Sequence, residues 1–395
     1  MSYKEITATE EIIKDKIVLL RSSLNVDIGN TGQIEEAIRL DRAISYIKKI
    51  APAAKKILII GHLGRPDGYE AHLSFKNSIY PYIKSRISEL ELLPDLTKNS
   101  RKFFTESSSK LFLLENIRFF KAEQSDAKES NEKFAELLAL ISDIFINDAF
   151  PAYRKSVSTY TIANFLPCYI GETYKAEIEA LDNFKSNPKR PFLVIVGGAK
   201  LSEKIDTLNL LGEKADKILV GGAIAYTLLL AKGVQVGNSL VELKKLDVAK
   251  QILKEFGNKI ILPVDHLVSE MFDINSKYEY ISSQQIPDNK FGIDIGTQTI
   301  ELFRSEIRKS SSILWNGPLG VFEWSHSSTG TYEIGKTIEG SSDFFSVVGG
   351  GDTIAAIRKL GLSKFDHVSL GGGAMLSYLA SENFPTLDII KSGNI

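Results

Sequence analysis

The chain has 395 residues, of which 43% are hydrophobic and 25% charged, and its 48 Lys and Arg against 49 Asp and Glu give a formal net charge of -1. This composition predicts large apolar cores and excludes a collagen, a disulfide-stapled scaffold and a disordered chain. Near-neutrality argues against a general nucleic-acid binder, and the length predicts two or three domains at roughly 150 residues each.

Short apolar runs alternate along the chain with segments whose apolar residues have helical spacing, such as residues 37–49 and 130–141. Continuous apolar runs are typical of strands buried on both faces. The expected strands are residues 16–20, 57–60, 111–114, 144–146, 192–196, 218–220, 260–262, 313–315, 345–348 and 367–370. Strands that alternate with helices predict βαβ units and therefore an α/β fold with parallel sheets.

The segment 171–190 differs from its surroundings. Its apolar residues recur at spacings of four and three among charged ones, which predicts an amphipathic helix that ends before Pro188. Glycine usage changes there too, since six of the 29 glycines precede residue 186 and 23 follow it. A surface helix within one domain is the alternative. We expect a domain at 1–170, an interdomain helix at 171–190 and a second domain at 191–379.

Cationic and amide side chains follow the expected strands of the first half. They are Arg21, Asn25, His62, Arg65, Asn116, Arg118, Asn147 and Arg154. Ligands of open parallel sheets bind beyond the carboxyl ends of the strands, and Arg can bind a carboxylate or phosphate with two hydrogen bonds. This set predicts a site for a small, multiply anionic ligand, although any one of these residues alone could be a solvated charge.

Glycine-rich turns follow strands of the second half, at 197–198, 221–222, 349–351 and 371–373. Glycine in such turns lets a ligand approach the backbone and exposes helix N-terminal N–H groups to phosphate. The second half is therefore predicted to bind a nucleotide. Lys200 and Lys204 follow the first turn, and Asp352 suits either an N-cap or a Mg²⁺ ligand beside phosphate.

Other motifs indicate less. Residues 330–337 match the P-loop pattern, but no strand precedes them, so we treat the match as a coincidence. No Gly-x-Gly-x-x-Gly fingerprint follows a strand, which counts against a dehydrogenase, and the five histidines lack metal-ligand spacing. The single Cys168 is typical of a reducing compartment. Because neither a signal core nor a membrane segment is evident, we expect a cytoplasmic protein.

Eight segments in a fixed order resemble those of the phosphoglycerate kinase family, over essentially the whole chain. They are residues 61–66 (GHLGRP), 114–119 (LENIRF), 147–150 (NDAF), 197–205 (GGAKLSEKI), 262–265 (LPVD), 315–323 (WNGPLGVFE), 349–353 (GGGDT) and 371–374 (GGGA). The resemblance implies two Rossmann-like domains that face each other across a cleft, with residues 380–395 returning to the first domain.

The resemblance also implies a phosphotransferase with a carboxyl acceptor. It would exchange a phosphoryl group between 1,3-bisphosphoglycerate and ADP, giving 3-phosphoglycerate and ATP, by in-line transfer after domain closure. The positions that match the family's phosphoglycerate site are Asn25, Arg39, His62, Arg65, Arg118 and Arg154. Those that match its nucleotide site are Gly198, Lys200, Lys204, Asn316, Glu323, Gly350, Gly351, Asp352 and Thr353.

Within these sets, Arg39 and Lys200 are expected to stabilise the transferring group, and Asp352 to hold the Mg²⁺ that accompanies ATP or ADP. From the residues alone, Arg42 competes with Arg39, since both lie on one helical pattern. The expected partners are small molecules, with neither nucleic acid nor membrane involved, and the expected state is a monomer.

Several positions depart from the family pattern. Ser23 stands where Asp is usual, Phe120 replaces a His, and the family's His-Arg-Ala-His stretch reads Tyr153-Arg154-Lys155-Ser156. Most departures surround the expected acceptor site. They leave a second hypothesis open, in which the chain is a catalytically altered nucleotide-binding homologue with a regulatory or scaffold role.

Overall fold

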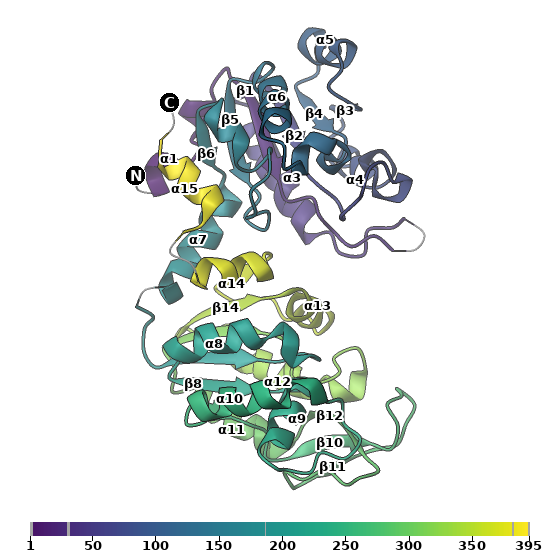
Figure 1. Cartoon of the computed structure of the whole chain (residues 1–395), viewed down its shortest axis with the longest axis vertical. Coiled ribbons are helices and arrows are strands. Elements are labelled where there is room, and N and C mark those ends of the chain that lie inside the picture. The colour runs from purple at the N-terminus through teal and green to yellow at the C-terminus, as the bar shows by residue number, and fades with distance from the viewer. Residues whose placement is uncertain (1–2, 30–31, 186, 381–382, 394–395) are drawn as a thin grey trace. The chain divides into compact units, whose positions relative to one another are not determined.

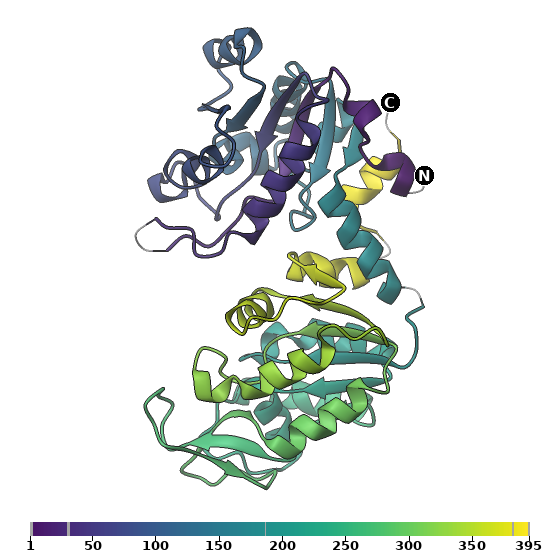
Figure 2. The same ribbon diagram turned by 180° about the vertical axis from the view of Figure 1, so that it is seen from behind.

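The computed structural model describes residues 3–29, 32–185, 187–380 and 383–393, and it divides into two compact units (Figures 1 and 2). Unit 1 comprises Met1–Glu179 and Ser381–Ile395, and unit 2 comprises Ala180–Ala380. The chain therefore passes between the units twice. The first passage lies within helix α7 (Glu172–Lys185), in the segment where a helix was expected. The domain limits expected at residues 170, 190 and 379 stay predictions.

A six-stranded parallel sheet lies at the centre of unit 1. Its order is β3-β4-β2-β1-β5-β6, with β1 at Ile17–Ser22, β2 at Lys56–Ile60, β3 at Leu90–Leu93, β4 at Leu111–Leu114, β5 at Ile144–Asp148 and β6 at Cys168–Ile170. Val18 and Leu20 of β1 pack in one apolar core with helix α3 (Ile38–Ile50), whereas Leu19 packs in another with α6 (Lys128–Ala139). Both faces are buried, which explains the continuous apolar runs.

Unit 2 has its own six-stranded parallel sheet, in the order β15-β14-β13-β7-β8-β9. The strands are β7 (Phe192–Val196), β8 (Lys217–Val220), β9 (Ile260–Ile261), β13 (Ser312–Asn316), β14 (Phe345–Gly349) and β15 (His367–Ser369). Helices α11 (Thr297–Ile307), α12 (Thr329–Ile338) and α13 (Gly351–Lys359) contribute to the core against one face. The two parallel sheets confirm the predicted α/β fold.

Some strands were not predicted. Strand β3 contains Glu91, β6 has three residues at a sheet edge, and unit 2 holds an antiparallel sheet in the order β11-β10-β12. Its strands are β10 (His266–Ser269), β11 (Tyr278–Ile281) and β12 (Phe291–Ile295). Strand β11 is mostly exposed, so its sequence lacks the apolar run by which the buried strands were found.

The remaining α-helices lie before, between and after these strands. They are α1 (Tyr3–Ile6), α2 (Glu10–Ile13), α4 (Ile79–Lys84), α5 (Lys98–Glu106), α8 (Ile205–Lys214), α9 (Gly222–Ala231), α10 (Leu246–Phe256), α14 (Gly372–Ala380) and α15 (Pro385–Lys391). The P-loop-like residues 330–337 lie inside helix α12, so that match is indeed a coincidence. Within the described ranges, every helix is too short or too polar to cross a bilayer.

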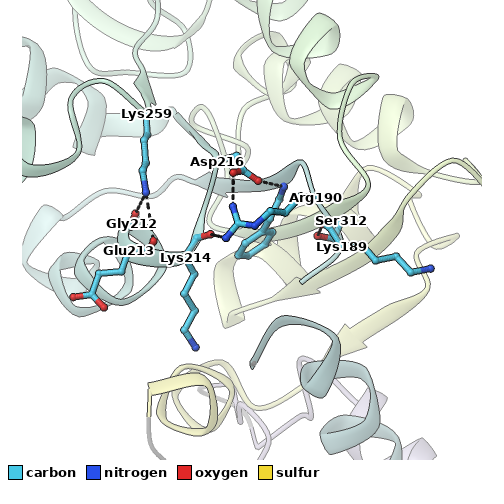
Figure 3. A network of polar contacts seen from close by, with 9 residues as sticks. Lys189, Arg190, Gly212, Glu213, Lys214, Asp216, Lys259 and Ser312 are labelled. Atoms are coloured by element: carbon cyan, nitrogen blue, oxygen red, sulfur yellow. Dashed lines mark hydrogen bonds and ion pairs between the residues drawn. The ribbon is translucent and has the colours of Figure 1, made fainter. Parts of the chain in front are cut away.

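Polar contacts fix the start of unit 2 around Asp216 (Figure 3). The Asp216 carboxylate forms an ion pair with Arg190 and accepts a hydrogen bond from Phe192 N over 2.7 Å. Ser312 Oγ donates to Lys189 O over 2.6 Å. The segment between α7 and β7 is thereby held where β7 and β13 begin.

The C-terminal residues belong to unit 1, beside strand β6 (Figure 1). Helix α15 begins at Pro385. In its first turn, the Thr386 hydroxyl oxygen lies 3.0 Å from the hydroxyl oxygen of Tyr174 in α7. Of the segment 380–395 expected to return to the first domain, residues 381–382 and 394–395 lie outside the described residues.

Candidate functional site

The cationic side chains of unit 1 follow the carboxyl ends of its strands. Arg21 lies near the end of β1, His62 follows β2, Arg118 lies in the short 3-10 helix Ile117–Phe119 after β4, and Arg154 follows β5. Because neighbouring parallel strands end at the same sheet edge, the fold places these residues on one rim. The predicted small-anion site therefore has a common location in unit 1.

Arg21, which is buried, and His62, which is partly buried, form the centre of this rim. Arg21 Nη2 and His62 Nδ1 are 2.6 Å apart, and Arg21 also donates from Nε to Ser158 Oγ over 3.0 Å. Burial lowers the pKa of Arg21 to about 10, so it stays protonated at neutral pH. A guanidinium only donates hydrogen bonds, so His62 Nδ1 accepts and the ring proton resides on Nε2.

The pKa of His62 is lowered well below 6.5, first by burial and then by a set of positive charges. These charges belong to Arg21, Arg118, Arg39 and Arg65. The imidazole is therefore a neutral donor among arginines at physiological pH. Convergence of so many cations on one neutral ring is favourable chiefly where an anion is to be bound.

Arg39 and Asn25 lie together next to this cluster. Arg39, in the first turn of α3, donates from Nη1 to Asn25 O over 2.6 Å, and Asn25 Oδ1 accepts from Gly64 N over 2.8 Å. The Arg118 guanidinium donates to Gly64 O. The loops after β1, β2 and β4 are thus tied to one another. Arg42 belongs to the same helix, where burial lowers its pKa and the carboxylates of Glu177 and Glu36 raise it, so it has local acidic partners.

Arg65 and Arg154 are the exposed members of the set. Burial lowers the pKa of Arg118, and the charges of Arg65 and Arg154 lower it further. Both exposed arginines are therefore near enough to act electrostatically on Arg118. The structure brings together all six residues that were expected to bind phosphoglycerate.

Glu123 and Ser158 hold Arg21 in place through hydrogen bonds, and neither residue was in the set expected from the sequence. Glu123 is 3% exposed and accepts hydrogen bonds from Ser158 N and Oγ over 3.0 and 2.6 Å, and from Ser156 Oγ over 2.7 Å. Burial raises its pKa, against the effect of these donors and of Arg21. Ser158 thus relays between a buried carboxylate and a buried guanidinium.

Asn116 is a second supporting residue. Its fully buried amide donates to Leu63 O over 2.9 Å and to Leu73 O over 3.0 Å, and its Oδ1 accepts from Arg118 N over 3.2 Å. These contacts set the start of the segment that carries Arg118. A polar residue directly after a buried strand was the signal for it in the sequence.

In unit 2, the glycine turns after β7 and β13 contact each other through the backbone. A Cβ on Gly197 would lie 2.0 Å from Pro318 O, and one on Gly317 would lie 2.1 Å from Gly197 O. Gly198 and Gly350 adopt φ of +115° and +102°, which side chains other than glycine rarely tolerate. The turns therefore require glycine for their own geometry, besides any ligand.

Asn316 and Thr353 connect two of these turns, those after β13 and β14. Asn316 Nδ2 donates to Gly349 O over 3.0 Å, while Thr353 Oγ1 accepts from Gly317 N over 2.7 Å and donates to Gly349 O over 2.9 Å. Both side chains are buried. The Thr353 hydroxyl is therefore committed to the turns, and the part of Thr353 left to offer a ligand is its backbone N–H in the first turn of α13.

The charged residues of the predicted nucleotide site differ in exposure. The Lys204 ammonium donates to Asn316 Oδ1, and burial lowers its pKa against the opposing charge of Asp352. Lys200 is 62% exposed and lies 3.7 Å from Glu203 Oε1. Asp352 is exposed in the first turn of α13, directly after Gly350 and Gly351.

Glu323 lies apart from these contacts in the sequence, in the loop after β13. Its side chain is exposed, and its backbone oxygen accepts from Lys359 Nζ over 2.6 Å. This contact joins the loop to the last turn of α13. The carboxyl ends of β7, β13 and β14 carry Lys200, Lys204, Asn316, Asp352 and the glycines. Glu323 instead contacts Lys359 at the far end of α13.

Comparison with known proteins gives one consistent result. The sequence model of the family "Phosphoglycerate kinase" matches residues 8–382. A phosphoglycerate kinase of Borreliella burgdorferi (strain ZS7) is 38% identical over 389 residues, 95% of this chain and 96% of that protein. One of Dictyoglomus turgidum is 37% identical over 394 residues, 97% of each.

Solved structures agree with these relatives. The phosphoglycerate kinase of Coxiella burnetii has a TM-score of 0.83 and 32% identity, covering 96% of this chain and 97% of its own. That of Pyrococcus horikoshii OT3 has a TM-score of 0.84 and 30% identity, covering 97% and 98%.

Proposed function

The chain belongs to the phosphoglycerate kinase family, and from this membership we propose how its two sites divide the reaction. The enzyme transfers a phosphoryl group reversibly between 1,3-bisphosphoglycerate and ADP, giving 3-phosphoglycerate and ATP. The observation that carries the proposal is the neutral His62 within its group of arginines. Such a group suits a ligand that bears both a phosphate and a carboxylate.

Unit 1 binds the phosphoglycerate. Arg65, Arg118 and Arg154 supply the exposed and half-buried guanidiniums for its phosphate, and His62 donates from Nε2. Asn25 helps to hold the loop that faces them. The acceptor carboxylate is already ionised at pH 7, so the transfer needs no general base. Catalysis then depends on positioning and on stabilising the charge of the transferring group.

Unit 2 binds the nucleotide. The N–H groups at the start of α13, after Gly350, and the turn at Gly198 face the phosphates, while Lys204 is held by Asn316. Glu323 is assigned to the nucleotide site because its position matches that site in the family. Lys200, exposed and only weakly paired, is free to reach the transferring phosphoryl group from this unit, and Arg39 reaches it from unit 1.

Magnesium fits the residues present. Asp352 offers an exposed carboxylate in the first turn of α13, and no group of three potential protein ligands occurs in the part of the chain that the structure describes. That donor set suits Mg²⁺, which binds through one or two carboxylates plus phosphate oxygens. When bound, the ion neutralises phosphate charge, and Asp352 would hold it beside the nucleotide.

The two substrates bind to different units, so we propose that the units close to bring them together and to exclude water during in-line transfer. We further propose that the enzyme acts as a cytoplasmic monomer. The alternative, a nucleotide-binding homologue without this activity, is not favoured, because the acceptor arginines are all present and clustered.

A coupled assay with 3-phosphoglycerate and MgATP tests the function directly, with Lys200→Ala as the matched control. We expect turnover well above that of the control. Equal turnover of the two proteins would contradict the proposal. Calorimetry then separates the alternative, which predicts binding of ADP without binding of 3-phosphoglycerate.

A further inference from the structure

The loop that carries Arg154 is attached to the C-terminal segment of unit 1 by aromatic rings. Tyr153 stacks on Phe384, with ring centroids 5.8 Å apart and an interplanar angle of 19°. Phe150 also stacks on Phe384, at 5.5 Å and 17°. Phe384 is 1% exposed and directly precedes helix α15. The Phe384 ring, from the C-terminal segment, therefore helps to hold this loop in place.

The other side of the loop is held by hydrogen bonds. Thr159 Oγ1 donates to Arg154 O over 2.8 Å, and Ser156 N donates to Thr159 Oγ1 over 3.1 Å. Ser156 Oγ in turn donates to the buried Glu123. Arg154 thus lies between a hydrogen-bonded anchor that follows it and an aromatic anchor that precedes it.

The aromatic anchor also contacts the arginine itself. The Arg154 guanidinium carbon lies 5.9 Å from the centroid of the Tyr153 ring, at the outer range of a cation–π interaction. Arg154 is otherwise exposed, and a long exposed side chain loses rotamer freedom when it binds a ligand. The Tyr153 ring, itself stacked on Phe384, restricts the guanidinium before the ligand binds, so less rotamer freedom is lost on binding.

We propose that Tyr153 and Phe384 form a positioning pair that presets Arg154 for the phosphate of the substrate. The proposal rests on the proposed role of Arg154 as a phosphoglycerate ligand. It gives a function to Tyr153, one of the positions at which this chain departs from its family. It also makes the C-terminal segment, which enters unit 1 after Ala380, a determinant of affinity at the acceptor site.

Steady-state kinetics of Tyr153→Leu, Tyr153→Phe and Phe384→Leu test the pair. Leu keeps apolar volume but removes the ring, so Tyr153→Leu should raise KM for 3-phosphoglycerate by about three- to tenfold, the range expected for loss of one aromatic pair. KM for ATP and kcat should stay within about twofold. Tyr153→Phe keeps the ring and should restore the wild-type KM.

Two further variants distinguish positioning from packing. Tyr153→Leu combined with Phe384→Leu should be no worse than the poorer single variant, because both remove one stack. The matched control is Tyr82→Leu, which removes a partly buried Tyr of α4 whose ring centroid lies 3.6 Å from the Arg86 guanidinium carbon. This control should leave both KM values unchanged.

The proposal is overturned if Tyr153→Leu keeps the wild-type KM for 3-phosphoglycerate, or if Tyr153→Phe fails to restore it. It is also overturned if Arg154→Ala leaves that KM unchanged. The wild-type enzyme is measured in the same assay. If it turns over, the proposed function holds, and these results count against the positioning pair alone. Thermal unfolding of each variant shows whether it folds, and the exposed side of Tyr153 makes its variants the decisive ones should Phe384→Leu be unstable.

Discussion

Arg21 Nη2 and His62 Nδ1 lie 2.6 Å apart at the centre of the unit 1 rim. A histidine ring can usually exchange its proton between its two nitrogens. The contact with Arg21 fixes which nitrogen of His62 accepts a hydrogen bond and which donates one. The arginine keeps Nδ1 as an acceptor, so the ring proton resides on Nε2 and can be donated from there. We therefore predict that His62 binds the substrate by donating a hydrogen bond and takes no part in proton transfer.

His62 should consequently show no titration near neutral pH. Its pKa is lowered well below 6.5, so nitrogen NMR of the labelled protein should find one neutral tautomer, protonated at Nε2, throughout pH 6 to 8. KM for 3-phosphoglycerate should show no step from this group over the same range. A midpoint near 6.5 assigned to His62, and absent in His62→Gln, would contradict this reading.

The same shift predicts how stability depends on acid. The folded protein holds His62 neutral while the unfolded chain binds a proton below about pH 6.5, so acid favours unfolding. The contribution of His62 is fully present above that pH and is lost as the pH falls below it. His62→Gln should flatten the dependence of the free energy of unfolding on pH between 6.5 and 5, measured by urea titration. A variant with the wild-type slope would show that other groups cause it.

The site residues at the strand ends were predictable from the sequence, whereas the buried residues that hold them in place were not. Arg21, His62 and Arg118 could be found because each follows an apolar run that is long enough to identify a buried strand. Glu123 lies in the short 3-10 helix Lys121–Gln124 and Ser158 lies in a turn, and neither segment has such a pattern. A glutamate that becomes 3% exposed looks in sequence like any surface charge. Burial of a polar group depends on tertiary packing, which local periodicity does not encode.

Unit 2 shows the same division. The glycine turns predicted a phosphate site, but the sequence could not tell which glycines serve the fold. Gly317 is required by its contact with Gly197, whereas Gly351 has no atom within 4 Å of a Cβ position. Thr353 likewise matched a nucleotide-binding position, and its hydroxyl proves to hold the turns together.

Gly351→Ala should therefore separate binding from folding. Its Cβ would meet open space in the free protein, so the melting temperature should stay close to that of the wild type. If nucleotide phosphates approach the start of α13, the added methyl group should weaken ADP binding by about tenfold or more in calorimetry.

Gly350→Ala is the matched comparison. At φ +102°, and with a Cβ only 2.9 Å from Asn316 Nδ2, it should lose stability as well as ADP affinity. Wild-type ADP affinity in Gly351→Ala would place the phosphates elsewhere.

Asp352→Asn tests the magnesium ligand. Removing the charge while keeping the shape should abolish most of the gain in ADP affinity that Mg²⁺ provides, by roughly tenfold or more. Affinity for metal-free ADP should hold or improve, because a carboxylate no longer repels the phosphates. Calorimetry with and without Mg²⁺ measures both. An unchanged Mg²⁺ effect in the variant would mean that Asp352 does not hold the ion.

Replacing Lys200 or Lys204 by Ala should affect different properties of the enzyme. Lys204 is partly buried and bound to Asn316, so Lys204→Ala should weaken nucleotide binding and lower the melting temperature together. Lys200 is 62% exposed, with Glu203 3.7 Å away as its ionic contact, so its loss should leave stability and ADP affinity nearly unchanged.

A group that acts mainly on the transition state affects kcat more than ground-state binding, and loss of one such contact typically costs about a hundredfold or more. Lys200→Ala should therefore lower kcat to that extent. Equal losses of kcat in both variants, with equal losses of ADP affinity, would place Lys200 in ground-state nucleotide binding instead.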